Sequence, residues 1–148
     1  MLPNNKISEA QAVLANIPPV SQGVGTAVSG WVSIKNAQAI LGLISVGVFG
    51  ASATVDAKFQ QATSAAGAGA KDITGKAITQ LLAAGGNNRL TEINVRPQDL
   101  DTNGGFSFVQ LSVTVGTAAT LISAEVLAST RYLPASDLNA AAVAQIVA

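Results

Sequence analysis

The stretch from Gly30 to Gln61 constrains the fold of this 148-residue chain more than any other part of it. After Gly30 it reads WVSIKNAQAILGLISVGVFGASATVDAKFQQ, which is rich in strand-forming residues and nearly free of reactive groups. Its glycines recur at intervals that suit strands better than helices. The stretch therefore predicts packed strands and contact surface, and it indicates a structural role more strongly than any chemistry.

Two strands are predicted within this stretch. Ala37 to Phe49 is apolar on both faces, which is typical of a strand buried between layers or at an interface. Residues 55–60 alternate apolar and polar side chains, as a half-exposed strand does. Either a second sheet or a neighbouring subunit must cover the second apolar face of the first strand. The two faces of that strand consist of Ile40, Ile44, Val46 and Val48 on one side and Leu41, Leu43 and Phe49 on the other.

A membrane span is the alternative interpretation of this apolar region. Ala37 to Val55 is free of charge over 19 residues, which is long enough to cross a bilayer. Gly42, Gly47 and Gly50 interrupt it, however, and no aromatic or basic belt flanks it, so strands are favoured. The N-terminal sequence MLPNNKISEAQAV lacks a basic region followed by an apolar run, and no signal peptide is predicted.

The charge of the chain is low and balanced. Charged residues make up 11% of the sequence, against about a quarter in a typical soluble protein. Eight basic residues balance eight acidic ones without any charge run, so no nucleic acid partner is expected, because phosphate neutralisation needs clustered Lys and Arg. A surface with so little charge is poorly protected against association, which favours a place inside an assembly.

The chain contains neither Cys nor His. Disulfides, thiolate nucleophiles, the usual zinc sites and imidazole general bases are thereby excluded. Apart from Asp99 and Asp101, which are two positions apart, the carboxylates are widely separated in the sequence, as Glu9, Glu92 and Glu125 illustrate. We therefore predict that the protein is not an enzyme and that it has no catalytic residues and no cofactor.

Three regions are expected along the chain. Residues 1–24 form an N-terminal arm, with a short helix that begins at Ser8 and ends at the Pro18-Pro19 pair. Residues 25–134 form a β-sandwich domain. Residues 135–148 form a C-terminal tail, which is either a short helix or an apolar strap onto a neighbour.

The pattern of the central region predicts seven or eight short strands. Strands are expected over Thr26–Ile34 and Leu90–Val95, whereas Lys71–Leu82 is compatible with strand or helix. The turn at Asp99–Gly105 contains Asn-Gly, a strong hairpin signal. The alternating run over 109–115 and the run over 121–132 are expected to form a second hairpin, in which Ile122, Ala124, Val126 and Ala128 face inward. This spacing of strands and turns indicates an all-β sandwich or barrel.

One turn resembles half of a calcium loop. Asp99, Asp101, Asn103 and Gly104 place oxygen ligands at alternate positions and glycine in the sixth position, but Gln110 stands where the loop needs a bidentate Glu. The same residues suit an ordinary turn, because Asp, Asn and Gly tolerate left-handed backbone. We favour the turn and predict no metal site, with Asp99, Asp101 and Asn103 as the only candidates.

A second loop has a superficial likeness to a phosphate-binding loop. Residues 67–71 read GAGAK, but Ala70 stands where the second glycine should precede the lysine, and Asp72 replaces Ser or Thr. A solvated loop is therefore expected.

Four short segments resemble small virion proteins of tailed bacteriophages. They are SGWVSIKN at residues 29–36, ATVDAKFQQAT at 53–63, GAGAKDI at 67–73 and STRY at 129–132. The likeness is closest to capsid decoration, or cement, proteins of the jelly-roll type, and it covers residues 29–132. It consists of packing motifs without a catalytic signature.

The resemblance implies a fold, a partner and a location. The fold would be a jelly-roll-like antiparallel β-sandwich, and the protein would bind the outside of a phage capsid and stabilise contacts between major capsid protein subunits. Its partners would be the major capsid protein and further copies of itself, as a dimer or trimer, without nucleic acid or membrane. It would be found on the capsid surface, and in the host cytoplasm during assembly.

Two other functions remain open from the sequence. One is a phage tail, neck or fibre-base component with the same fold, and the other is a calcium- or glycan-binding β-sandwich module. Trp31 is the only tryptophan and is either a core anchor or an interface hot spot. The predicted interface residues are Trp31, Ile40, Ile44, Phe49, Arg131 and Tyr132.

Overall fold

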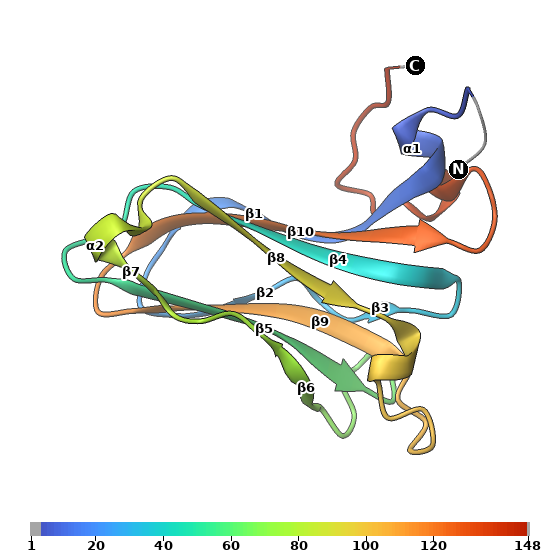
Figure 1. Cartoon of the computed structure of the whole chain (residues 1–148), viewed down its shortest axis with the longest axis horizontal. Coiled ribbons are helices and arrows are strands. Elements are labelled where there is room, and N and C mark those ends of the chain that lie inside the picture. Colours follow the sequence, from blue (N-terminus) through green and yellow to red (C-terminus); the bar gives the residue numbers. More distant parts are fainter. Residues whose placement is uncertain (1–3, 148) are drawn as a thin grey trace.

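Two antiparallel sheets face each other in the computed structural model, which describes residues 4–147 (Figure 1). Sheet A has the strand order β1-β10-β4-β8, and sheet B has the order β2-β9-β5-β6, with β3 on β9 and β7 on β5. The strands of sheet A are β1 (Gln11–Gln22), β10 (Thr120–Thr130), β4 (Ala37–Val46) and β8 (Arg89–Val95). Those of sheet B are β2 (Gly25–Val28), β3 (Val32–Ser33), β9 (Phe108–Gly116), β5 (Thr54–Ala62), β6 (Lys71–Ala77) and β7 (Leu81–Leu82).

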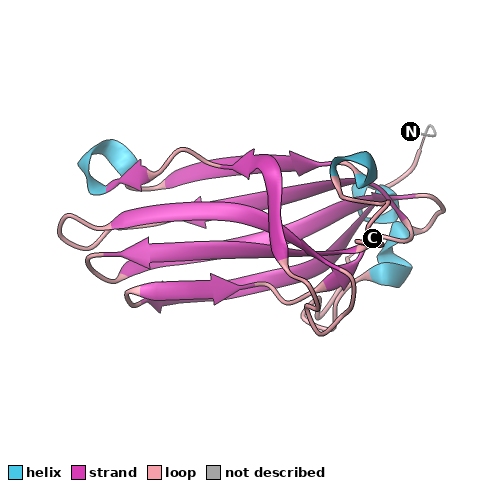
Figure 2. Ribbon diagram, turned by 90° about the horizontal axis from the view of Figure 1, so that it is seen from below, coloured by secondary structure: helices cyan, strands magenta, loops and turns pink. Residues whose placement is uncertain are grey.

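Short helices lie at the two ends of the sandwich, beyond the strands (Figure 2). None of the helices described is long and apolar enough to cross a membrane. They are α1 (Ile7–Ala10), α2 (Ala83–Gly86) and the 3-10 helices η1 (Pro97–Asp99) and η2 (Ala135–Leu138).

The strand pairing is that of a jelly roll. The first strand pairs with the last, β2 and β3 pair with β9, β4 pairs with β8, and β5 pairs with β6. The chain is thus one long antiparallel hairpin with its tip between β5 and β6. Rolling this hairpin brings β10 beside β4 and β9 beside β5, which completes the two sheets. The predicted all-β, jelly-roll-like sandwich is confirmed.

The two predicted hairpins are wrong as strand pairs. The turn at Asp99–Gly105 leads from β8 in sheet A to β9 in sheet B, and residues 117–119 lead from β9 back to β10 in sheet A. Turn residues specify where the chain reverses. Which sheet the next strand joins is decided by the packing of its apolar face, and in a jelly roll most connections cross between the sheets.

The core lies between the inner faces of the two sheets. The prediction for β10 is confirmed, because Ile122, Ala124, Val126 and Ala128 are at most 3% exposed. Val, Ile and Ala dominate the core. The largest fully buried side chains are Phe59, Ile40, Ile44, Leu111, Val46, Val55, Val95, Val109, Val113, Val115, Val126 and Thr120.

Gly42 makes room for the largest of these side chains. A Cβ atom at Gly42 in sheet A would lie 2.6 Å from Cε2 and 2.9 Å from Cζ of Phe59, which comes from sheet B. The glycine that interrupts the apolar run of β4 is therefore a packing device, because the aromatic ring occupies the space that a side chain would need.

The N-terminal arm predicted over residues 1–24 is largely part of the sandwich. The helix ends at Ala10, and β1 then runs antiparallel to β10, with Ala12, Ala15 and Ile17 buried. Pro18-Pro19 does not end a helix but lies within β1, where the register shifts between Ile17 and Val20. Prolines are tolerated there because β1 is an edge strand and the pairing is already irregular. Residues 1–3 of the arm lie outside the described residues.

Two other predicted elements differ in detail. The strand expected over Thr26–Ile34 is divided into β2 and β3, because Gly30 adopts a φ of 86° and turns the chain before Trp31. The segment Lys71–Leu82 forms strands β6 and β7 and no helix.

The C-terminal tail is fastened to the edge of β1. After η2, the Asn139 side-chain oxygen accepts a hydrogen bond from the Val13 N–H at 2.8 Å, and the Ala140 N–H donates to the Val13 carbonyl at 2.7 Å. These bonds satisfy backbone groups that the edge strand would otherwise expose. Residues 144–147 are exposed and have no regular structure, and residue 148 lies outside the described part.

Gly42→Ala should destabilise the sandwich by about 1–3 kcal/mol, because the added methyl group overpacks the core against Phe59. Urea unfolding followed by circular dichroism measures this loss. Gly23→Ala is the matched control, since a Cβ there meets nothing within 4 Å. Adding Phe59→Leu to Gly42→Ala should cost less than the sum of the two single changes, and simple additivity would refute the contact.

Candidate contact surface

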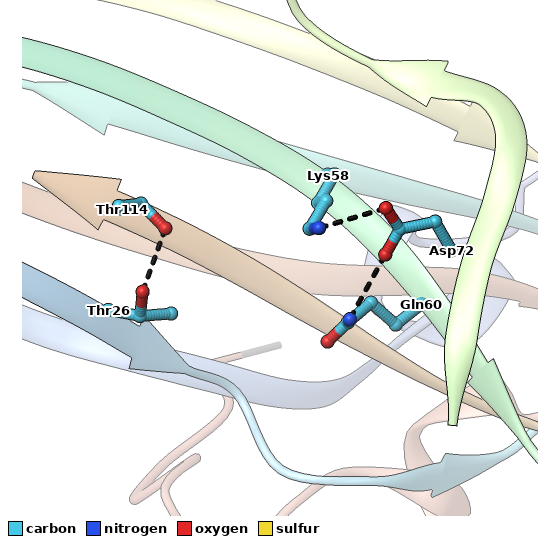
Figure 3. A network of polar contacts seen from close by, with 5 residues as sticks. All are labelled: Thr26, Lys58, Gln60, Asp72 and Thr114. Atoms are coloured by element: carbon cyan, nitrogen blue, oxygen red, sulfur yellow. Dashed lines mark hydrogen bonds and ion pairs between the residues drawn. The ribbon is translucent and has the colours of Figure 1, made fainter. Parts of the chain in front are cut away.

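The outer face of sheet B is polar, and its groups bond to one another (Figure 3). Lys58 Nζ lies 2.9 Å from Asp72 Oδ2, Gln60 Nε2 donates to Asp72 Oδ1 at 3.0 Å, and the hydroxyls of Thr26 and Thr114 are 2.8 Å apart. The hydrogen bonds from Lys58 and Gln60 lower the pKa of Asp72. Among the described register positions that share this face, the large apolar residues are Val28, Leu82 and Phe108, and most of the others are polar. The positions are Thr26, Val28, Thr54, Asp56, Lys58, Gln60, Ala62, Asp72, Ala77, Leu82, Phe108, Gln110, Ser112 and Thr114.

The outer face of sheet A carries several large apolar side chains. Along β4 and β10 every second residue is buried in the core, so the residues between them point away from sheet B. Cross-strand pairing then places their neighbours on β1 and β8 on the same face. We define this outer face by eleven positions, which are Val13, Asn16, Leu41, Leu43, Ser45, Leu90, Glu92, Asn94, Ser123, Glu125 and Leu127.

Glu125 lies near the middle of this face. Its cross-strand neighbours are Asn16 on β1 and Leu43 on β4, and Glu92 follows on β8 in the same row. Partial burial raises the pKa of Glu125. The ion pairs of residues 4–147 involve none of the eleven outer-face positions. The face therefore combines five apolar residues with two carboxylates and no cation.

Apolar side chains also gather at the two ends of the molecule. One end carries α2 and the loops after β1, β4 and β9, and the other carries both termini (Figure 1). Exposed large apolar residues belong to both ends. They are Val24, Val48, Leu82, Leu90 and Leu121 near the α2 end, and Ile7, Tyr132, Leu133, Ile146 and Val147 near the termini.

The structure divides the six predicted interface residues into two groups. Ile40, Ile44 and Phe49 are at most 8% exposed and belong to the core, so their assignment to an interface is wrong. The inner face of β4, to which Ile40 and Ile44 belong, is the one that sheet B covers. The large apolar residues of β4 that remain partly exposed are Leu41 and Leu43.

The other three predicted interface residues remain on the surface. Trp31 is partly exposed and lies against the loop at Gly67, where a Cβ would come within 2.5 Å of the indole nitrogen. Arg131 and Tyr132 are exposed just beyond the end of β10. Their role in an interface stays a prediction.

Sequence reasoning did not identify the neighbours that complete the outer face of sheet A. Leu127 and Glu125 belong to the alternating run over 121–132. From the sequence, Glu125 was interpreted as an exposed residue or an interface ion-pair partner, but its neighbours on the outer face were not identified. Val13 was assigned to a helix. The register of β1, β10 and β4 is what brings these residues beside Leu41 and Leu43.

The calcium-loop candidates form an ordinary turn. Asp101 Oδ1 accepts a hydrogen bond from the Gly104 N–H at 2.9 Å, and its Oδ2 lies 2.7 Å from Lys71 Nζ. The same ammonium group lies 4.2 Å from the centre of the Phe106 ring. The hydrogen bond from Lys71, followed by that from Gly104, lowers the pKa of Asp101. Lys71 of the GAGAK loop thus forms an ion pair with a carboxylate of the same chain.

Asp99 is likewise occupied. Its Oδ2 accepts a hydrogen bond from the Arg96 N–H at 2.8 Å and lies 3.1 Å from Lys76 Nζ, and the backbone bond from Arg96 is the main cause of its lowered pKa. Asn103 is exposed at the tip of the turn. Within residues 4–147, no three His, Cys, Asp or Glu side chains are grouped so that they could hold a metal ion. A calcium ion at this turn would have to displace the lysines.

No protein-family model matches the chain, and no curated protein sequence matches it. Two similar solved structures come from viruses. A chain in the structure of infectious bursal disease virus Gx strain has 15% identity and a TM-score of 0.43, with 85% of this chain and 34% of that chain covered. A chain in the cryo-EM atomic structure of broad bean stain virus has 12% identity and a TM-score of 0.36, with 76% and 65% covered. This chain thus spans only part of either neighbour, and its jelly-roll assignment rests on its own strand order.

Calcium should leave the melting temperature of the protein unchanged, because Lys71 and Lys76 already neutralise the two aspartates of the turn. Differential scanning calorimetry with calcium or with a chelator tests this. A rise in melting temperature that disappears in Asp101→Ala would establish a calcium site instead.

Glu125→Gln should stabilise the isolated protein at neutral pH by less than about 1 kcal/mol, since the carboxylate is still partly solvated. Its pKa is raised on folding, so the folded state holds the proton more tightly than the unfolded state. The contribution of Glu125 to stability is therefore lost as the pH rises through the range of this carboxyl group, whereas the variant has no such loss at this position. Unfolding curves at pH 3 and pH 7 measure the difference in free energy of unfolding between the wild type and the variant. This difference should vanish at pH 3. An equal effect at both pH values would show that ionisation is not the cause.

Proposed function

We propose that this chain is a structural virion protein, a cement protein that binds the outside of a tailed-phage capsid and stabilises contacts between major capsid protein subunits. The observation that carries the proposal is the contrast between the two outer faces. That of sheet B is mostly polar and internally bonded, whereas that of sheet A presents five large apolar side chains and two carboxylates without a cation. The jelly-roll sandwich and the four phage-like segments in residues 29–132 support it.

Cementing requires only the burial of surface between proteins and no chemical reaction. Each square ångström of apolar surface removed from water contributes about 25 cal/mol, so a modest contact repeated over many copies raises the free energy needed to separate shell subunits. The protein acts without catalysis and without a cofactor. Its partners are the major capsid protein and other copies of itself, and it resides on the capsid surface after a period in the host cytoplasm during assembly.

Shells that lack this protein should release their DNA at lower temperature and survive osmotic shock less well than complete shells, because the added contacts are missing. The measurement compares particles from a virus with the coding region deleted and from the same virus complemented with the wild-type chain. Equal resistance of the two would contradict cementing.

A copy number comparable to that of the major capsid protein is expected, whereas a single ring of copies would indicate a neck, tail or fibre-base part.

A further inference from the structure

The outer face of sheet A has the extent of a protein–protein contact. Four strands spaced by about 4.8 Å and ten residues of β4 rising by about 3.3 Å each give a face of roughly 600 Å² in projection. One partner in a standard-size interface buries about 800 Å² of accessible surface, which is comparable. Sheet A can therefore form most of such a contact without help from the loops.

The terminal segments add to this side of the molecule. α1 and the C-terminal segment rise beyond one end of sheet A, on the side away from sheet B (Figure 1). The C-terminal segment is held to β1 through Asn139 and Ala140, and it ends in exposed apolar residues. A partner on the outer face would meet this raised end as well.

The charges of the face identify what its partner must provide. All eight lysines and arginines of the chain lie outside the eleven positions. Lys58 belongs to sheet B, where Asp72 already binds it. Docking an apolar surface onto Leu41, Leu43 and Leu127 would remove water from Glu125, and a carboxylate so buried is costly unless a cation meets it.

A second copy of the chain does not provide that cation. Two copies joined through this face about a two-fold axis would bring Glu125 and Glu92 of both into one dehydrated layer with no positive side chain between them. Sheet B of a second copy is polar and does not match the leucines. The face therefore suits a different protein.

We propose that the outer face of sheet A is the surface that docks on the shell, and that the shell surface it fits is apolar and presents a lysine or arginine to Glu125. This proposal rests on the proposed cement function and adds the docking face and the chemistry of the partner surface. Leu43, Leu41 and Leu127 supply the apolar contact around the acidic centre.

The test measures binding of purified protein to shells of the encoding virus that were assembled without it. Glu125→Gln keeps the size of the side chain and removes its charge, and Leu43→Thr replaces a leucine by a polar strand former. We expect each to weaken binding by about tenfold or more, and Glu125→Gln to reduce the salt dependence of binding as well. Asp56→Asn, which removes one carboxylate from sheet B, is the matched control and should bind as the wild type does.

The possible results separate the docking face from the function. Failure of the wild type to bind any shell overturns the cement function itself. Normal binding by the wild type, by Glu125→Gln and by Leu43→Thr leaves cementing intact and overturns the docking face. If the wild type forms a dimer in sedimentation experiments and Leu43→Thr dissociates it, the occupant is a second copy and the proposed partner is wrong. Because Glu125→Gln is expected to fold at least as well as the wild type, misfolding does not obscure its result.

Discussion

The packing of the two inner faces against each other is the interaction on which the rest of the molecule depends. The side chains at this contact are small or β-branched, apart from a few large ones such as Phe59, and they interdigitate closely enough that Gly42 must lack a side chain. Because strand side chains alternate strictly, burying one set determines which residues point outward on every strand. The surface of sheet A is thus a consequence of the core: once Ile40 and Ile44 face sheet B, Leu41 and Leu43 must face away from it.

Much of the fold could be predicted from local patterns. Strands β4, β5, β8, β9 and β10 were all visible as alternating or apolar runs, because period-two burial leaves a trace in the sequence. The assignment of strands to sheets was not visible, since a connection with turn residues can join strands of one sheet or of two. β1 was missed for another reason: its buried residues are interrupted by bulges near Val13 and Pro18, which break the alternation and imitate helical spacing.

From the sequence, a contact surface on β4 could be predicted, but the face of the strand that forms it could not. The apolar character of both faces of β4 showed that something beyond one sheet had to cover it, but which face sheet B would take was not decided by the strand alone. Ile40, Ile44 and Phe49 belong to the core, and the cross-strand partners of Leu41 and Leu43 come from β8 and β10, which both lie much later in the chain. Sequence spacing carries no information on such register. The turn at Asp99–Gly105 shows the same limit, because its turn-forming residues were visible in the sequence while its lysine partners came from β6.

The distribution of charge links stability to docking. Asp72, Asp99 and Asp101 each have a lysine of the same chain nearby. Their pKa values are lowered, mainly by the lysine for Asp72 and Asp101 and mainly by the backbone hydrogen bond from Arg96 for Asp99. Glu125 has no such lysine, and its ionised form is disfavoured in the isolated protein. A residue that costs stability and contributes nothing to the core is expected where function requires it. A cation from a partner would turn that cost into a favourable contact, so the charge of Glu125 should act in opposite directions on the free and the docked chain. A residue retained only for solubility would not show that reversal, because its charge would remain hydrated in both states.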